Sequence, residues 1–155
     1  MVSGRNVTPT FVQNLGLQDS IDWQLDLPAA DIPTVIQAHH VMVLPYRESS
    51  KLKLLGSLRG TSGALSWAVA CGRGAITSDA RSFAEEVAHG NGVIFPQGNV
   101  TALAAELSRL CATPELAISW AGQASVVGQQ RVWSHTAERF LQLFQAACGG
   151  HEDVA

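Results

Sequence analysis

The sequence has few charged residues and no long hydrophobic run. Only 15% of its 155 residues are charged, and the formal net charge is −3. These values exclude a strongly charged disordered chain and give no electrostatic support for nucleic-acid binding. No apolar run approaches the roughly 18–20 residues that cross a bilayer, and the N-terminus lacks the apolar segment of a signal peptide. We therefore expect a cytoplasmic protein that binds no nucleic acid.

Cysteine is also scarce, and the common motifs of nucleophilic catalysis are missing. Cys71, Cys111 and Cys148 lie far apart and form no Cys-x-x-Cys pair. An odd number of widely spaced cysteines indicates reduced, mostly buried thiols rather than a disulfide framework. The sequence contains no Gly-x-Ser-x-Gly elbow and no cysteine and histidine close enough to suggest a nucleophile and its base. No catalytic residue is assigned.

Apolar residues make up 46% of the chain and form alternating strand and helix patterns. The predicted strands are 20–25, 40–45, 74–78 and 92–95, and the predicted helices are 10–15, 31–38, 63–71 and 82–88. Strands that alternate with helices imply βαβ units, with a parallel sheet and helices on both of its faces. The sequence therefore predicts one α/β domain, whose apolar run at 40–45 suits a strand buried on both faces.

Three further helices are predicted after the last strand. Asn99 is expected to cap the first helix, and Pro114 opens the second. The first helix has an apolar face made of Val100, Leu103, Leu107 and Leu110. Ser134 is expected to cap the third helix, whose predicted buried stripe is Phe140, Leu143, Phe144 and Ala147.

The most informative segment is the turn Gly60-Thr61-Ser62-Gly63, which precedes the predicted helix 63–71. In open parallel sheets, ligands bind beyond the carboxyl ends of the strands, near helix N-termini. Glycine lets the backbone come close to a ligand, and the helix dipole favours an anion such as a phosphate. Arg59 would add positive charge. An ordinary capped helix start fits the same residues.

Other polar residues give weaker signals. His39 and His40 could form a metal pair, but no further ligand stands at a suitable spacing, so a helix end is favoured. Glu85 and Glu86 could bind a sugar hydroxyl or a ribose, although adjacent carboxylates are typical of a solvated helix face. The segment 47–53 is expected to be a solvated loop or helix face, with contact to a phosphate or a membrane headgroup as the alternative.

The residues AVACGRGAITSDARSFAEEVAHGNGVIFPQGNVTALAAELSRL, at 68–110, carry a family resemblance. The order and spacing of the small-residue helix, Cys-Gly, Ser-Asp and Phe-Pro-Gln-Gly resemble the C-terminal half of GT-B glycosyltransferases of the group 1 (family 4) type. The segment ADIPTVIQAHHVMVLPY upstream and the segment WSHTAERFLQLF downstream extend the resemblance to roughly residues 7–144.

The resemblance implies a partial, Rossmann-like nucleotide-sugar-binding domain over 1–148 and a flexible tail over 149–155. It implies retaining transfer of a sugar from a UDP- or GDP-sugar to a glycan or lipid-linked acceptor, with no cofactor and no tightly bound metal. The family's phosphate-binding turn falls on Gly60–Gly63. Ser78, Asp79 and Glu85 would then approach the sugar or the nucleoside.

The chain also departs from the family at its donor site. Many members carry two glutamates eight positions apart around this turn, the second holding the donor ribose. Those positions are Arg59 and Trp67 here, which puts ribose binding by the usual residue in doubt. Ser66 or the pair Glu85 and Glu86 are the nearest substitutes.

Two strands of the family's domain, and its whole acceptor-binding half, have no counterpart upstream. The family's strand order leaves the edge of 40–45 open, and open edges invite pairing with another chain. We therefore expect a donor-binding fragment that is inactive alone and that would contact the acceptor, and any membrane, through the missing half. The last helix would pack near the hinge of the complete enzyme. The alternative is a catalytically inactive, truncated or degenerate α/β interaction module.

Overall fold

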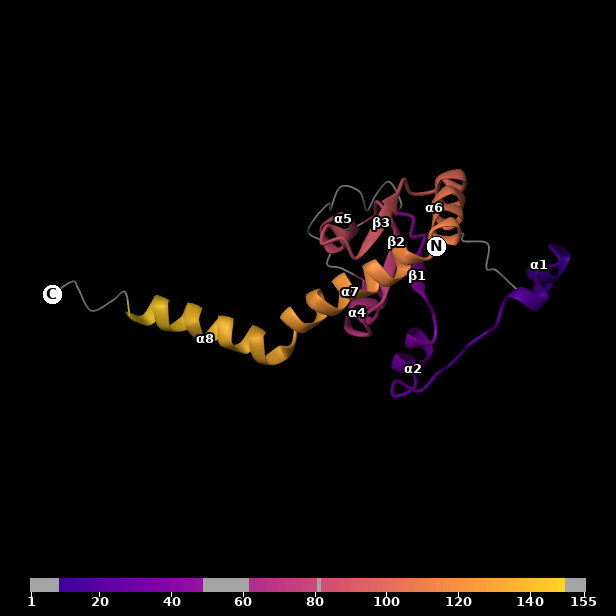
Figure 1. Ribbon diagram of the computed structural model, residues 1–155. Helices are drawn as coiled ribbons and strands as arrows, with labels where there is room; N and C mark the ends of the chain where they lie inside the picture. Colours follow the sequence, from indigo (N-terminus) through magenta and orange to yellow (C-terminus); the bar gives the residue numbers. More distant parts are fainter. Residues whose placement is uncertain (1–8, 49–61, 81, 150–155) are drawn as a thin grey trace. The chain divides into compact units, whose positions relative to one another are not determined.

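The computed structural model describes residues 9–48, 62–80 and 82–149 (Figure 1). Contacts along the chain divide it into two compact units, Met1–Ile32 and Pro33–Ala155. The predicted single domain over 1–148 stays a prediction, and all but the first residue of the predicted tail lie outside the described residues.

The first unit contains the helix α1 (Pro9–Asn14) and the 3-10 helix η1 (Gln18–Ser20). Gly16 follows α1 with a φ of 67°, a conformation that favours glycine and that ends the predicted helix 10–15. The predicted strand over 20–25 is wrong. Residues 21–25 form no strand, and Leu25 is 71% exposed. Alternating apolar residues indicate a strand face, but a strand also needs a backbone partner, and no strand among the described residues pairs with this segment.

A parallel three-stranded sheet forms the centre of the second unit. Its strands are β1 (Val41–Leu44), β2 (Gly74–Ser78) and β3 (Gly92–Phe95), in the order β1-β2-β3. The helices are α2 (Ile32–Gln37), α4 (Gly63–Ala70), α5 (Phe83–Val87), α6 (Val100–Ala112), α7 (Glu115–Gln130) and α8 (Trp133–Gly149). This arrangement confirms the predicted Rossmann-like α/β fold.

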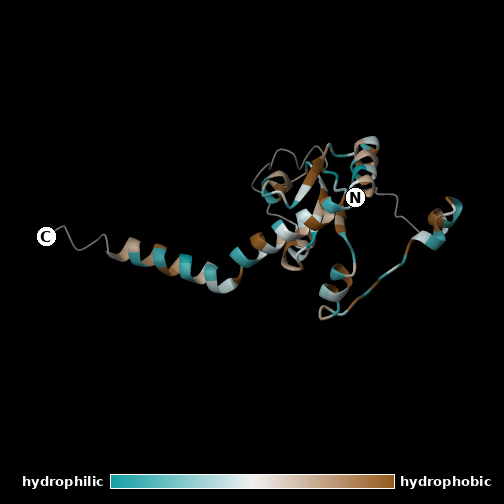
Figure 2. Ribbon diagram, in the orientation of Figure 1, coloured by the Kyte–Doolittle hydropathy of each residue, from teal (hydrophilic) through white to brown (hydrophobic). Residues whose placement is uncertain are grey.

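The central strand β2 is buried along its whole length. On one face, Ala75 packs in a cluster with residues of α4 and α5, among them Leu65 and Phe83. On the other face, Ile76 packs with Phe95 and Trp120, covered by residues of α6 and α7. Figure 2 shows the hydrophobic colouring of the strands. Both sets of helices therefore pack against β2, one set on each face of the sheet.

Local capping signals fix both ends of α4. The Ser62 side chain accepts a hydrogen bond from the Ala64 amide at 3.2 Å. At the other end, Gly72 has a φ of 62°, and the Arg73 amide donates to the Ala68 carbonyl at 2.8 Å. A glycine with positive φ and this backward hydrogen bond form a Schellman stop. The predicted helix start and stop are both confirmed.

Several predicted apolar faces are less buried than the sequence indicates. Asn99 caps α6 as predicted, and Leu103 and Leu110 pack against the core. Val100, however, is 78% exposed, because it starts the helix beyond the sheet. In β1, Val43 is 37% exposed because this strand is an edge of the described sheet, so the expected burial of both its faces is wrong.

The last helix differs most from expectation. It begins at Trp133, which places Ser134 inside the helix rather than at its cap. Its predicted buried stripe is exposed: Phe140, Leu143 and Phe144 are 55–66% accessible. The amphipathic pattern predicts that α8 has an apolar face, but not which surface covers it. None of the described helices combines the length and hydropathy needed to cross a bilayer.

The close approach of β3 to β2 predicts a severe effect of one added methyl group. A Cβ atom on Gly92 would overlap the backbone carbonyl of Ala75. We expect Gly92→Ala to lower the free energy of unfolding in urea by about 3 kcal/mol, the upper range for overpacking. In α7, a Cβ on Gly122 meets no described atom within 4 Å. Gly122→Ala should raise stability by about 0.5–1 kcal/mol, and equal effects of the two changes would contradict the close approach.

Candidate functional site

The carboxyl edge of the sheet gathers polar residues from four segments. Because all three strands are parallel, their carboxyl ends meet at one edge, where ligands bind in such folds. Tyr46 follows β1, Asp79 follows β2 and Gln97 follows β3, while Ser62 and Gly63 begin α4. Arg59, Gly60 and Thr61 of the predicted turn lie outside the described residues.

A hydrogen bond ties the start of α4 to the end of β1. The Tyr46 hydroxyl lies 2.9 Å from the Ser62 hydroxyl, which also accepts from the Ala64 amide. Ser62 is 4% exposed, and the Tyr46 ring packs against Phe83 of α5 with a centroid separation of 5.3 Å. The capping residue is therefore held by two elements besides its own helix, which fixes the position of the helix N-terminus.

A second set of hydrogen bonds joins the loops that follow the three strands. The Asp79 carboxylate accepts a hydrogen bond from the backbone amide of Gln97 at 2.8 Å. The Gln97 side-chain oxygen in turn accepts from the backbone amide of Glu48 at 2.9 Å. The Asp79 amide donates to the Phe95 carbonyl at 2.9 Å. Asp79 is exposed. One of its carboxylate oxygens organises the edge, and the residue as a whole remains accessible from solvent.

The predicted site residue Ser78 is completely buried. Side chains alternate along a strand, so Ser78 shares the face of Ile76, which packs under α7, whereas Thr77 shares the face of Ala75, which packs under α4. The hydroxyls of Ser78 and Thr77 have no hydrogen-bond partner among the described residues. Thr77, rather than Ser78, therefore lies on the face of the sheet that α4 covers.

The other predicted residues lie on exposed helix surfaces. Ser66 and Trp67 are one turn into α4, and Trp67 is 39% exposed. Glu85 is exposed on α5. Its neighbour Glu86 forms an ion pair with Arg131 at the end of α7. Hydrogen bonds therefore join Ser62 and Asp79 to the carboxyl edge, and the Ser66 hydroxyl donates to the Ser62 carbonyl at 3.4 Å.

Sequence reasoning missed Tyr46 and Gln97 at this edge, and it included Arg47 only in the segment 47–53, with contact to a phosphate as the alternative. The Arg47 guanidinium lies beside Gly98, where a Cβ would come within 3.3 Å of its Nε atom. Each of the three residues stands one to three positions after a strand. That placement in a parallel sheet was the available signal, because such positions face the ligand-binding edge.

The histidine pair behaves as a helix end rather than as a metal site. His39 Nδ1 donates to the Val35 carbonyl at 2.6 Å, a carbonyl at the end of α2 that also accepts from the Ala38 backbone amide. Across the described part of the chain, no three His, Cys, Asp or Glu side chains are placed to hold a metal ion.

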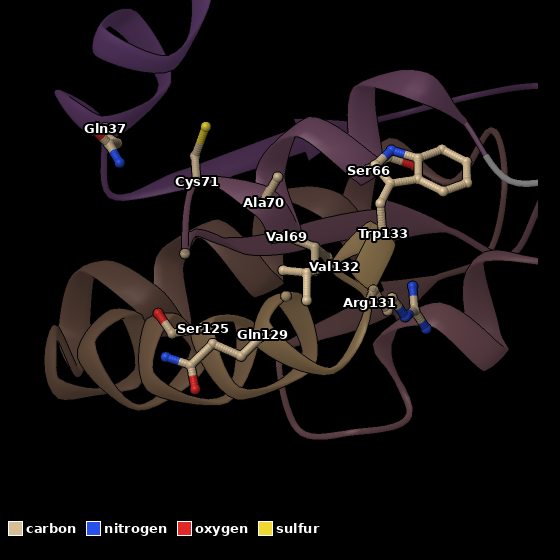
Figure 3. A pocket seen from close by; sticks show the side chains of 12 residues that line it. Gln37, Ser66, Val69, Ala70, Cys71, Ser125, Gln129, Arg131, Val132 and Trp133 are labelled. Atoms are coloured by element: carbon tan, nitrogen blue, oxygen red, sulfur yellow. The ribbon is translucent and has the colours of Figure 1, made fainter. Parts of the chain in front are cut away.

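A cavity lies at the opposite end of α4 from Ser62. Its volume is about 750 Å³, and its lining includes Cys71, Ser125, Gln129 and Trp133 (Figure 3). Ser66 is the one predicted site residue on its wall. Burial raises the pKa of the Cys71 thiol, and the nearby Arg73 guanidinium partly opposes the rise. Because the thiolate is the reactive form, burial makes Cys71 a weaker nucleophile than an exposed thiol.

The contact between Tyr46 and Ser62 predicts measurable coupling. We expect Ser62→Ala to lower the free energy of unfolding by about 1 kcal/mol, because the helix loses its capping oxygen. Tyr46→Phe removes the other partner, and the double variant should show a coupling of about 0.5–1.5 kcal/mol in urea denaturation. Ser125→Ala, whose hydroxyl donates to a carbonyl inside α7, is the matched control and should not couple to Tyr46→Phe. Strictly additive effects of Ser62→Ala and Tyr46→Phe would show that the hydroxyl contact contributes nothing.

Comparison with known proteins completes the description of this edge. Residues 2–113, more than two thirds of the chain, match the family described as Glycosyl transferases group 1. No curated protein matches the chain significantly. The matched region includes the whole sheet, α4 and the carboxyl-edge residues described above. The chain belongs to the group 1 glycosyl transferases, which transfer a sugar from a donor to an acceptor.

Proposed function

We propose that this chain is the donor-binding part of a glycosyltransferase that moves a sugar from a UDP- or GDP-sugar to a glycan or lipid-linked acceptor, with retention of configuration. The observation that carries the proposal is the rigidly capped N-terminus of α4 at the carboxyl edge of a parallel sheet. In a family whose members use a sugar donor, this is the position that suits the donor's phosphates.

The start of α4 has the properties that a pyrophosphate requires. Backbone N–H groups and the positive end of the dipole collect at a helix N-terminus. At Gly63, an added Cβ would meet no other described atom within 4 Å, which leaves open space beside the first turn. Arg47 carries a positive charge on the same edge. Gly60 and Thr61 would extend this cradle, with Arg59 as a second cation.

The nucleoside and the sugar would contact residues on either side of the turn. Asp79 and Glu85 are exposed carboxylates that can accept hydrogen bonds from sugar hydroxyls. Ser66 and the exposed Trp67 follow the phosphate turn on α4 and would face the nucleoside. Because Ser78 is buried, it would act by fixing the end of β2 directly before Asp79.

A calorimetric titration with UDP, GDP and their sugars tests the donor site. The wild-type chain should bind one nucleotide class saturably, and Gly63→Val should abolish that binding, because its side chain would occupy the space beside the first turn. Gly122→Val introduces the same side chain into equally open space on α7 and should bind like the wild type.

Circular dichroism would show whether the Gly63→Val chain keeps its fold. Unchanged nucleotide binding by a folded Gly63→Val chain would remove the turn from the site.

The acceptor would be recognised by protein outside these residues. The isolated chain should therefore transfer no sugar in a cell-free assay, and clear turnover by the pure chain would contradict the role of a donor-binding part. Residence in the cytoplasm, where nucleotide sugars are available, is part of the same proposal.

A second candidate is an inactive α/β interaction module. It is favoured by one observation: Trp67, with Arg59, occupies a position where many family members have a carboxylate. A decayed module would show no saturable affinity for any UDP- or GDP-sugar, whereas the donor site would bind at least one of them.

A further inference from the structure

Gln97 bridges the segments that follow the two outer strands, across the end of β2. The Gln97 backbone amide donates to the Asp79 carboxylate at 2.8 Å, and the Gln97 Oε1 atom accepts from the Glu48 backbone amide at 2.9 Å. Glu48 follows β1 and Gln97 follows β3, on opposite sides of β2 (Figure 1). The bond to Glu48 is partly buried, so water competes for it less than at an exposed site. One glutamine therefore ties the segment after β1 to the ends of the other two strands.

The same loop also holds the side chain of Arg47, the residue before Glu48. Gly98 has a φ of 78°, in the left-handed region that favours glycine. A Cβ atom on Gly98 would lie 3.3 Å from the Nε atom of Arg47 and 3.4 Å from its Cζ and Nη2 atoms. The guanidinium therefore rests against the open side of Gly98, where a side chain would crowd it. Gln97 holds the backbone beside Arg47, and Gly98 leaves room for the guanidinium.

The Arg47 guanidinium is held in place and yet keeps its hydrogen-bond donors available. Arg109 and Arg131 form ion pairs with glutamates, and Arg73 donates to backbone carbonyls near the end of α2. No described residue forms a hydrogen bond or an ion pair with the guanidinium of the exposed residue Arg47. A guanidinium is a planar fork of N–H donors that matches the oxygens of a phosphate. Arg47 is therefore suited to bind an anion at this edge.

The segment 45–48 connects Arg47 to the start of α4. Tyr46, which precedes Arg47, lies within a 2.9 Å hydrogen bond of Ser62, the cap of α4. The free backbone N–H groups of the helix start and the Arg47 cation therefore belong to one edge, which is anchored at Ser62 and at Gln97. A diphosphate carries negative charge on both of its phosphates, so it suits two such groups.

We propose that Gln97 is a positioning residue of the donor site, which holds Arg47 in place to bind the donor's phosphates. This inference rests on the proposed donor function. Arginine has a long, flexible side chain, and ordering such a side chain on binding lowers affinity by roughly 2- to 10-fold. Because the bond to Glu48 and the contact with Gly98 order Arg47 before the donor arrives, donor binding avoids this loss.

Hydrogen exchange followed by NMR tests the bridge without any ligand. Gln97→Met keeps the size of the side chain and removes the acceptor, so exchange of the Glu48 amide should become roughly 3- to 10-fold faster. Gln97→Glu keeps an acceptor oxygen and should keep the exchange slow. Unchanged exchange in the Gln97→Met chain would show that the bridge contributes nothing, and would overturn the inference.

Calorimetric titration with UDP- and GDP-sugars tests the positioning. Arg47→Met should raise the donor dissociation constant by about 10- to 100-fold and reduce its dependence on salt, because a charged contact is lost. Gln97→Met should raise it by roughly 2- to 10-fold, and should have no further effect in a chain that already carries Arg47→Met. Gln129→Met makes the same change on α7, where Gln129 lines the cavity at the other end of α4, and should bind like the wild type.

The outcomes separate this inference from the proposed function. If the wild-type chain binds a nucleotide sugar and Gln97→Met leaves the dissociation constant unchanged, the donor site stands and the positioning role is wrong. Additive effects of Gln97→Met and Arg47→Met would show that Gln97 acts independently of Arg47, which also overturns that role. No saturable binding by the folded wild-type chain would overturn the donor function and this inference with it, whatever the exchange rate of the Glu48 amide.

Discussion

The burial of β2 on both faces is the constraint on which the second unit depends. Ala75 and Ile76 point into separate clusters, and a loss of either cluster would uncover one side of the strand. The approach of Gly92 to the Ala75 backbone brings β3 into register with this strand. Because β2 is central, the positions of β1 and β3 follow from it, and the helices follow from the two clusters.

The direction of the strands then decides where ligands can bind. All three strands end at the same edge, and α4 begins there with Ser62 anchored to Tyr46. The same edge carries Asp79, whose carboxylate joins the loop after β3. By contrast, the cavity at the far end of α4 is lined by Cys71, the pKa of whose thiol is raised by burial, and by Arg131, which forms an ion pair with Glu86. The proposed donor site therefore rests on strand polarity and the fixed helix start rather than on cavity size.

Local signals in the sequence predicted most helices and strands of the second unit, but they could not predict contacts between residues far apart in the sequence. Ser62 and Gly72 mark the two ends of α4. The bounds predicted for β2 and β3 from their apolar residues are the observed ones. The hydrogen bond between Tyr46 and Ser62 joins residues sixteen positions apart, and no periodic pattern in the sequence indicates it. For the same reason, the pattern around Trp23 resembled a strand although no described residue pairs with it. The apolar face of α8 could be predicted, but not the surface that covers it.

We propose a donor at the carboxyl edge, whereas Trp67 stands where many family members have a carboxylate, so occupancy of this edge is the central question. The most direct measurement is a titration of the isotope-labelled chain with UDP- and GDP-sugars, followed by NMR of its backbone amides. The account predicts saturable shifts centred on Ser62 and Gly63 and extending to Tyr46. Shifts that are absent in the folded chain, or that centre on Cys71 and Gly72 at the far end of α4, would contradict it.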